Sequence, residues 1–150
     1  MIDHVWTVVC SNVVIDVDSK SVSIHNAIEQ INIPFEPKPE GVLPIEFDIV
    51  TLWVRSDFDK PSTGHARISL LSPTGKKLQN HEYDLDKLAD FERLRARQHV
   101  RGLPASEPGR YTFYVELKSE GEGEWHHVAS VPLKIVFAPP ETKAEEAKQG

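Results

Sequence analysis

The stretch EPGRYTFYVEL (Glu107–Leu117) joins a turn to a strand with one apolar face. Proline and glycine near its start supply turn chemistry, because proline presets the backbone φ angle and glycine tolerates conformations closed to other residues. Beyond them every second side chain is large and apolar, namely Tyr111, Phe113, Val115 and Leu117. Strict alternation places these side chains on one face, so the stretch predicts a half-buried β-strand.

Further strand-like runs precede this one, and turn signals separate them. Residues 4–17 are rich in β-branched side chains, and residues 21–28 alternate apolar with polar positions. Residues 44–54 begin as an alternation and then become apolar on both faces, which is typical of a central strand. Residues 65–71 and 76–85 flank the turn sequence SPTG and predict a hairpin.

The last strand-like run covers residues 126–137 and contains Pro132. Proline cannot donate to a hydrogen-bond ladder, so its position indicates an edge strand or a bulge. Several short strands separated by turn signals predict an all-β sandwich or barrel.

Residues 84–94 (DLDKLADFERL) fit two interpretations. Apolar side chains three apart would suit a helix, whereas the alternation that follows suits a strand. We expect a short helix or turn near residues 85–90, followed by a strand from about Phe91 to Gly102.

Length and composition favour one globular domain over residues 1–137 and a flexible polar tail over residues 138–150. The formal net charge of −6 argues against general nucleic-acid binding, which usually requires a basic domain. The N-terminus lacks the basic region of a signal peptide, and no run approaches the roughly 20 apolar residues of a membrane helix. We therefore expect a soluble cytoplasmic protein without membrane association.

Two stretches together resemble a bacterial family of small all-β proteins of unknown function. They are VVIDVDSKSVSIHNAIEQINIP (residues 13–34) and VRGLPASEPGRYTFYVEL (residues 100–117), and the resemblance spans roughly residues 3–137. It implies an antiparallel immunoglobulin-like β-sandwich of about seven to nine strands. Its motifs are turns and core faces, so it assigns no catalytic residue.

No motif in the sequence points to a metal, a cofactor or an enzyme. The segment DVDSKS (residues 16–21) resembles the start of a calcium loop but lacks the central glycine and the distal glutamate, so we interpret it as a hairpin turn. The histidines lack metal-ligand spacing, and glycine-rich phosphate loops are absent. Cys10 is the only cysteine and lies in an apolar run, which predicts a buried side chain.

One candidate binding surface is RLRARQHVR, residues 93–101. On a strand, residues two apart share a face at a spacing of about 6.6–6.8 Å, so four arginines and one histidine would form a row. Such a row could bind an anion, or it could be the exposed face of a strand paired with carboxylates of Glu46 and Asp48, or of Glu82 and Asp84. The five residues are Arg93, Arg95, Arg97, His99 and Arg101.

We expect a non-enzymatic module for protein binding or assembly, with a protein partner or a second copy of the chain as its target. The proline-rich crossing at residues 34–44 offers Phe35, Val42 and Leu43 as contact residues. The alternative function is binding of an anionic ligand, such as a glycan, a nucleotide or a nucleic acid, through the arginine row.

Overall fold

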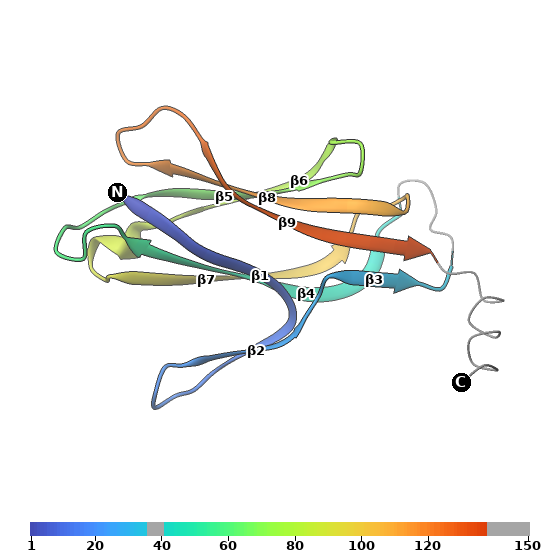
Figure 1. Cartoon of the computed structure of the whole chain (residues 1–150), viewed down its shortest axis with the longest axis horizontal. Coiled ribbons are helices and arrows are strands. Elements are labelled where there is room, and N and C mark those ends of the chain that lie inside the picture. Colours follow the sequence, from blue (N-terminus) through green and yellow to red (C-terminus); the bar gives the residue numbers. More distant parts are fainter. Residues whose placement is uncertain (36–40, 138–150) are drawn as a thin grey trace.

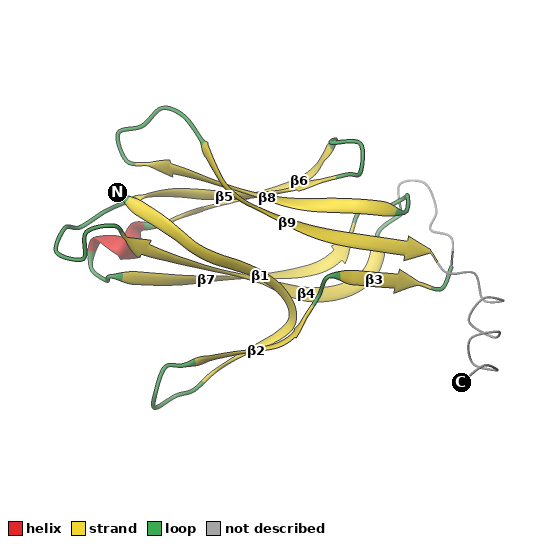
Figure 2. Cartoon of the chain, viewed as in Figure 1, coloured by secondary structure: helices red, strands yellow, loops and turns green. Residues whose placement is uncertain are grey.

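The computed structural model describes residues 1–35 and 41–137, and within them the chain is an all-β structure of two packed sheets (Figures 1 and 2). One sheet has four strands in the order β2-β1-β4-β7, and the other has five in the order β3-β9-β8-β5-β6. The elements are β1 (Ile2–Ile15), β2 (Val22–Ala27), β3 (Gln30–Ile33), β4 (Leu43–Arg55), β5 (Gly64–Leu71), β6 (Lys77–Asp84), η1 (Asp86–Ala89), β7 (Arg93–Leu103), β8 (Gly109–Ser119) and β9 (His126–Phe137).

Most predicted strands are present, and the two interpretations of residues 84–94 are resolved. The short 3-10 helix η1 confirms a turn near residues 85–90, and β7 follows it as a strand. The hairpin predicted around SPTG is formed by β5 and β6. The tail predicted at residues 138–150 lies outside the described residues.

The expectation of a wholly antiparallel sandwich is wrong for one pair of strands. β3 runs parallel to β9, with Ile31 beside Ile135 and Ile33 beside Phe137. The cause is a crossing: after β2, at the edge of one sheet, the chain passes to the other sheet and lies along its last strand. Because Ile33 is buried in the core, this short pairing is anchored by apolar packing.

The main core lies between the two sheets. β4 contributes Phe47, Ile49 and Trp53, and β8 contributes Tyr111 and Phe113, all of them buried. The phenyl rings of Phe47 and Phe113 meet edge to face across the sandwich, with centroids 5.9 Å apart. The alternation of both strands therefore fixes which side chains face inward.

Pro132 stands where β9 has a hydrogen-bonded neighbour on one side only. It pairs with Thr112 of β8, whereas the pairing with β3 begins at Lys134. The missing N–H therefore costs no ladder hydrogen bond on the open side.

A second apolar cluster lies on the outer face of the four-stranded sheet. Figure 1 shows β1 curving strongly, so that its second half and β2 form an arm beneath this sheet. The arm comprises residues 10–27, which pair with each other as an antiparallel hairpin. The cluster contains Cys10, Val13 and Val50, flanked by Trp6, Val8, Val22 and Ile24. Cys10 is fully buried there, as predicted, and burial raises the pKa of its thiol.

Candidate functional site: the arginine strand β7 and two adjacent recesses

The arginine row lies on the outer face of β7, the last strand of the four-stranded sheet. Leu94, Ala96 and Val100 point to the interior, where they are buried or half-buried, so the intervening side chains face outward. The structure therefore brings the four arginines and His99 onto one strand face, as the sequence predicts.

Two carboxylates of the neighbouring strand β4 neutralise the second half of the row. Arg97 Nη2 and His99 Nδ1 lie 2.9 and 2.8 Å from the carboxylate oxygens of Asp48. The contacts of Glu46 are longer, because its carboxylate oxygens lie 3.5 Å from His99 Nε2 and 3.9 Å from Arg101 Nε. This part of the row is therefore the exposed face of a strand pair, with Glu46 and Asp48 as its partners.

Asp48 is the buried member of this cluster, with 1% of its surface exposed. Burial alone would raise the pKa of its carboxyl group, but the hydrogen bonds from Arg97 and His99 outweigh that effect, so the pKa lies below its usual value. The carboxylate therefore holds the side chains of Arg97 and His99 in place and remains charged at neutral pH.

Arg93 and Arg95 differ from the rest of the row, because their partners across β4 are apolar. They face Val54 and Leu52 respectively, and neither has a carboxylate within salt-bridge distance in residues 1–35 and 41–137. Arg95 Nη2 donates a long hydrogen bond of 3.4 Å to the carbonyl of Lys20 at the tip of the arm. Its Nε is buried without an acceptor among the described residues.

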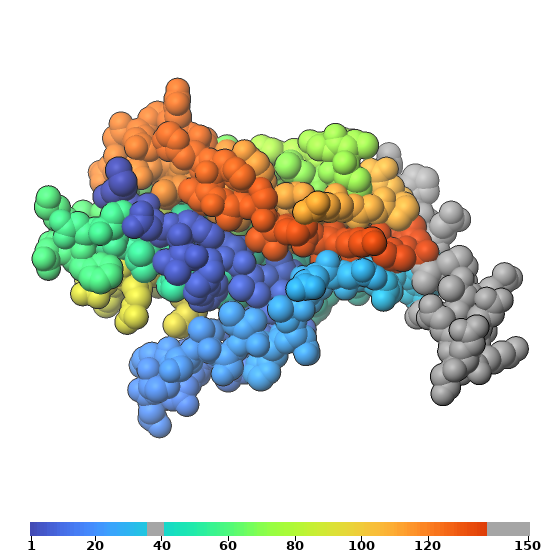
Figure 3. Space-filling view, viewed as in Figure 1, coloured from blue at the N-terminus to red at the C-terminus, as the bar shows by residue number. Residues whose placement is uncertain are grey.

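A cleft opens between these two arginines and the tip of the arm. In the space-filling view the arm, in blue, stands apart from the sheet and leaves a hollow beside it (Figure 3). The cleft has a volume of about 580 Å³ and is lined by Ser19, Lys20, Ser21, Leu52, Phe91, Arg93 and Arg95. Phe91 is 61% exposed, which is high for a phenylalanine. We call this recess the arm cleft.

The tip of the arm is held by its own side chains. The carboxylate of Asp16 accepts hydrogen bonds from the backbone N–H groups of Ser19 and Asp18, at 2.8 and 2.9 Å. These hydrogen bonds lower the pKa of Asp16. The segment DVDSKS is therefore the hairpin turn predicted from the sequence, and its first carboxylate is committed to the backbone.

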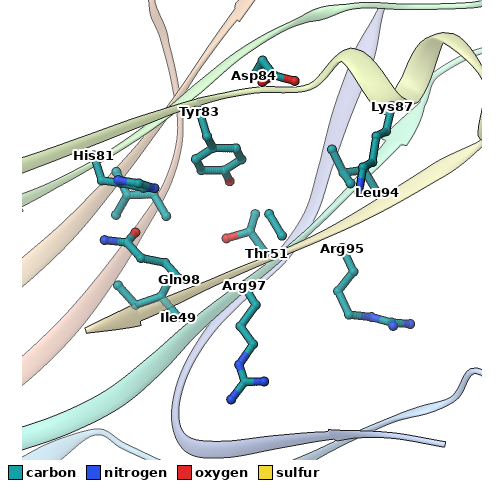
Figure 4. A pocket seen from close by; sticks show the side chains of 12 residues that line it. Ile49, Thr51, His81, Tyr83, Asp84, Lys87, Leu94, Arg95, Arg97 and Gln98 are labelled. Atoms are coloured by element: carbon teal, nitrogen blue, oxygen red, sulfur yellow. The ribbon is translucent and has the colours of Figure 1, made fainter. Parts of the chain in front are cut away.

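A second recess, the edge groove, lies between the edge strands β6 and β7 of the two sheets (Figure 4). Two adjoining hollows of about 300 and 340 Å³ form it, and they share Ile49, Ile68, His81 and Gln98. Figure 4 shows Tyr83 reaching from β6 toward Thr51, whereas Arg95 and Arg97 point away toward the outer face of the sheet.

The edge groove has polar groups set among apolar ones. The hydroxyl of Tyr83 accepts a hydrogen bond of 3.0 Å from Trp53 Nε1 and is thereby tied to the core. Gln98 Oε1 is buried without a donor in the part of the chain that the structure describes. The groove therefore combines aliphatic and polar side chains, and its wall holds one unused acceptor.

The three residues proposed for protein contact fare differently. Phe35 and Val42 are 50% and 63% exposed, which leaves them free to meet a partner. Leu43 is wrong as a contact residue, because it is the first residue of β4 and is 1% exposed within the core. The prolines around Leu43 predict one loop over residues 34–44, but β4 already begins at Leu43. Residues 36–40 of this crossing lie outside the described residues.

Metal-ligand side chains do not gather in the described ranges. No group of three or more histidine, cysteine, aspartate or glutamate side chains there could hold an ion. His126 instead lies 3.0 Å from Glu122, and His127 Nε2 lies 2.7 Å from Ser130 Oγ. No helix among the described residues has the length and apolar character needed to cross a membrane.

Comparison with known proteins assigns no family to this chain. No protein-family model matches it, and none of the curated proteins is significantly similar to it in sequence.

Proposed function

We propose that this protein is a non-enzymatic binding module that recognises an acidic segment of a partner protein at the arm cleft. The observation that supports this most directly is the uneven neutralisation of β7. Asp48 and Glu46 pair with Arg97, His99 and Arg101, whereas Arg93 and Arg95, beside the cleft, have no carboxylate partner among the described residues. Guanidinium groups bind carboxylates through two parallel hydrogen bonds, and an unpaired buried N–H gains most from an added acceptor.

The surroundings of the two arginines favour a protein partner over a nucleic acid. Phe91 and Leu52 add apolar surface to the cleft, which suits the side chains of a peptide. A polyanion would instead need a long row of unpaired positive charges. In β7 this row is interrupted, because Arg97 and Arg101 are already paired with carboxylates. The net charge of −6 would also repel a nucleic acid at longer range.

Binding of an anionic ligand such as a glycan, a nucleotide or a nucleic acid through the row is the second candidate. The buried Arg95 Nε supports it, because any anion with a free oxygen could supply the acceptor. The two candidates differ in salt dependence and in the need for apolar groups. A polyanion should bind with an affinity that falls steeply with salt, whereas a peptide that also contacts Phe91 should lose less.

We also propose that the sandwich is of the immunoglobulin-like type and that the chain belongs with the bacterial proteins it resembles. The order β9-β8-β5-β6 corresponds to strands G, F, C and C′ of a variable-type sheet. Tyr111, near the start of β8, donates a 2.7 Å hydrogen bond from its hydroxyl to the carbonyl of Glu107. A tyrosine at this place that bonds back to the upstream backbone is characteristic of immunoglobulin-like sandwiches.

The double variant Arg93→Ser/Arg95→Ser should bind a glutamate-rich peptide about tenfold more weakly than the parent protein, because two charge-assisted contacts are lost. Fluorescence anisotropy of a labelled peptide measures the change. Arg110→Ser removes an exposed arginine on the other sheet and serves as the control. Equal affinities of the double variant and the parent would contradict the proposal.

Glu46→Gln should strengthen binding of the same peptide by about two- to threefold. The variant removes the carboxylate that lies beside Arg101 and His99, whereas the contact of His99 with Asp48 remains. Glu46 is exposed, so the variant should fold normally. Glu124→Gln changes the net charge equally at an exposed loop position without a salt bridge in the described structure. If both variants bound the peptide more tightly, the gain in affinity would come from the change in net charge, and this would count against a site on β7.

A further inference from the structure

β7 ends its sheet with an unused edge. Among the described residues it is hydrogen-bonded to β4 on one side and to no strand on the other. It is 11 residues long and contains no proline. In such a strand every second residue directs its N–H and C=O groups toward the open side, where they form a template for another strand.

In the proposed immunoglobulin-like fold, a further strand would occupy the open side of β7. With β1, β4 and β7 taken as strands A, B and E, this sheet of an immunoglobulin sandwich would continue with strand D beyond β7. Here the chain passes from β6 through η1 directly into β7, so the position of strand D is vacant in the described structure.

The edge groove lies beside this open edge and can receive side chains. A strand added to β7 would extend the sheet over the gap between β7 and β6, with every second side chain directed inward. Those side chains would meet the two hollows of about 300 and 340 Å³, in which the buried side chains of Ile49, Ile68 and Leu70 lie among polar ones such as Gln79, His81 and Gln98. Apolar residues of moderate size fit this lining.

The outer face sets the charge of the incoming strand. Its outward side chains would lie beside Arg93 and Arg95, which have no carboxylate partner in the described ranges. Cross-strand pairs of opposite charge stabilise a sheet, and like charges destabilise it. A second copy of β7 would place two arginine rows side by side, so the charge pattern disfavours self-association through this edge.

We propose that β7 accepts an antiparallel strand from a partner protein, and that this strand alternates acidic residues, facing Arg93 and Arg95, with apolar residues that enter the edge groove. This inference rests on the proposed function, because it specifies how the acidic segment of the partner is bound. Main-chain hydrogen bonds would then supply affinity, and the alternating side chains would supply specificity.

The test uses the full chain and synthetic peptides that alternate glutamate and valine over the 11-residue length of β7. Two further peptides carry backbone N-methyl groups, one on every glutamate and the other on every valine. In an added strand only one of these two sets of N–H groups faces β7. Isothermal titration should therefore show that one methylated peptide loses at least about tenfold in affinity, whereas the other stays close to the parent. Amide hydrogen exchange should slow in β7 when the parent peptide binds.

The following outcomes would overturn strand addition at β7, and they also show whether the proposed function itself fails. If both methylated peptides bind as the parent does, and Arg93→Ser/Arg95→Ser weakens all three, recognition of acidic protein segments stands without an added strand. If no acidic peptide binds, both proposals fail. A protein dimer in sedimentation experiments whose β7 amides are already protected would show that a second copy occupies the edge instead.

Discussion

Replacing Arg55 by methionine is expected to lower the free energy of unfolding by about 3 kcal/mol. Arg55 is 8% exposed, and its guanidinium group donates hydrogen bonds to the carbonyl oxygens of Leu88, Phe58 and Ala89, at 2.7, 2.8 and 2.8 Å. Methionine can replace the aliphatic part of the arginine side chain but has no donor, so three carbonyl groups would lose their hydrogen-bond partner where little water reaches them. Urea unfolding followed by tryptophan fluorescence measures the loss.

Two further variants show what an unexpected result would mean. Arg110→Met replaces an exposed arginine and should change stability by less than about 0.5 kcal/mol. Arg55→Lys keeps the charge but lacks the planar fork, so it should recover only part of the loss. A loss below about 1 kcal/mol for Arg55→Met would indicate that water takes over the three carbonyl groups.

Arg55 also matters for the proposed binding surface, because its carbonyl partners Leu88 and Ala89 belong to η1. η1 leads into Phe91 and Arg93, which line the arm cleft. The Arg55→Met variant should therefore bind acidic peptide less tightly even under conditions in which most molecules are folded.

Asp48→Asn is expected to cost about 2 kcal/mol at neutral pH and to flatten the acid limb of the stability profile. The pKa of Asp48 in the folded state lies below its usual value, because the hydrogen bonds from Arg97 and His99 outweigh the effect of burial. A lowered pKa stabilises the fold above the pKa of the unfolded chain, and this stability is lost as the pH falls through the folded value. Asparagine has nearly the same shape but cannot carry the charge.

Chemical unfolding at a series of pH values from neutral to acid measures this effect. The difference between parent and variant should be largest near neutral pH and shrink as the pH falls below the ordinary range of an aspartate. Asp57→Asn, an exposed position whose only ion pair in the described structure is a 3.8 Å contact with Lys60, should leave the profile nearly parallel to that of the parent. Parallel profiles for Asp48→Asn would show that Arg97 and His99 do not stabilise the charged form.

The sequence predicts the strands and their faces well, because alternation depends on neighbours along the chain. Phe113 and its companions in β8 point inward as expected, and the arginines of β7 point outward. Which carboxylates would meet those arginines depends on which strand lies beside β7. Sequence alone left Glu46 and Asp48 as one pair of partners and Glu82 and Asp84 as the other, and the order of strands in the sheet decides for the first.

The parts that sequence reasoning missed come from the path of the chain in space. The arm cleft exists because β1 curves and brings Lys20 opposite Arg95, which lies 75 residues further along the chain. Tyr83 and Gln98 share the edge groove because two different sheets end side by side. Phe91 lies between Asp90 and Glu92, and these acidic neighbours are the one local signal in the sequence that it lies at the surface.

The parallel pairing of β3 with β9 has a consequence for how the chain acquires its structure during synthesis. Gln30 lies beside Lys134 and Ile33 beside Phe137, so a segment made early must wait for one made about a hundred residues later. At roughly 5–20 residues per second, a ribosome needs several seconds to deliver the second partner. During that interval Ile31 and Ile33 have no strand to join, and the nascent chain presents a short apolar segment that a ribosome-associated chaperone could hold.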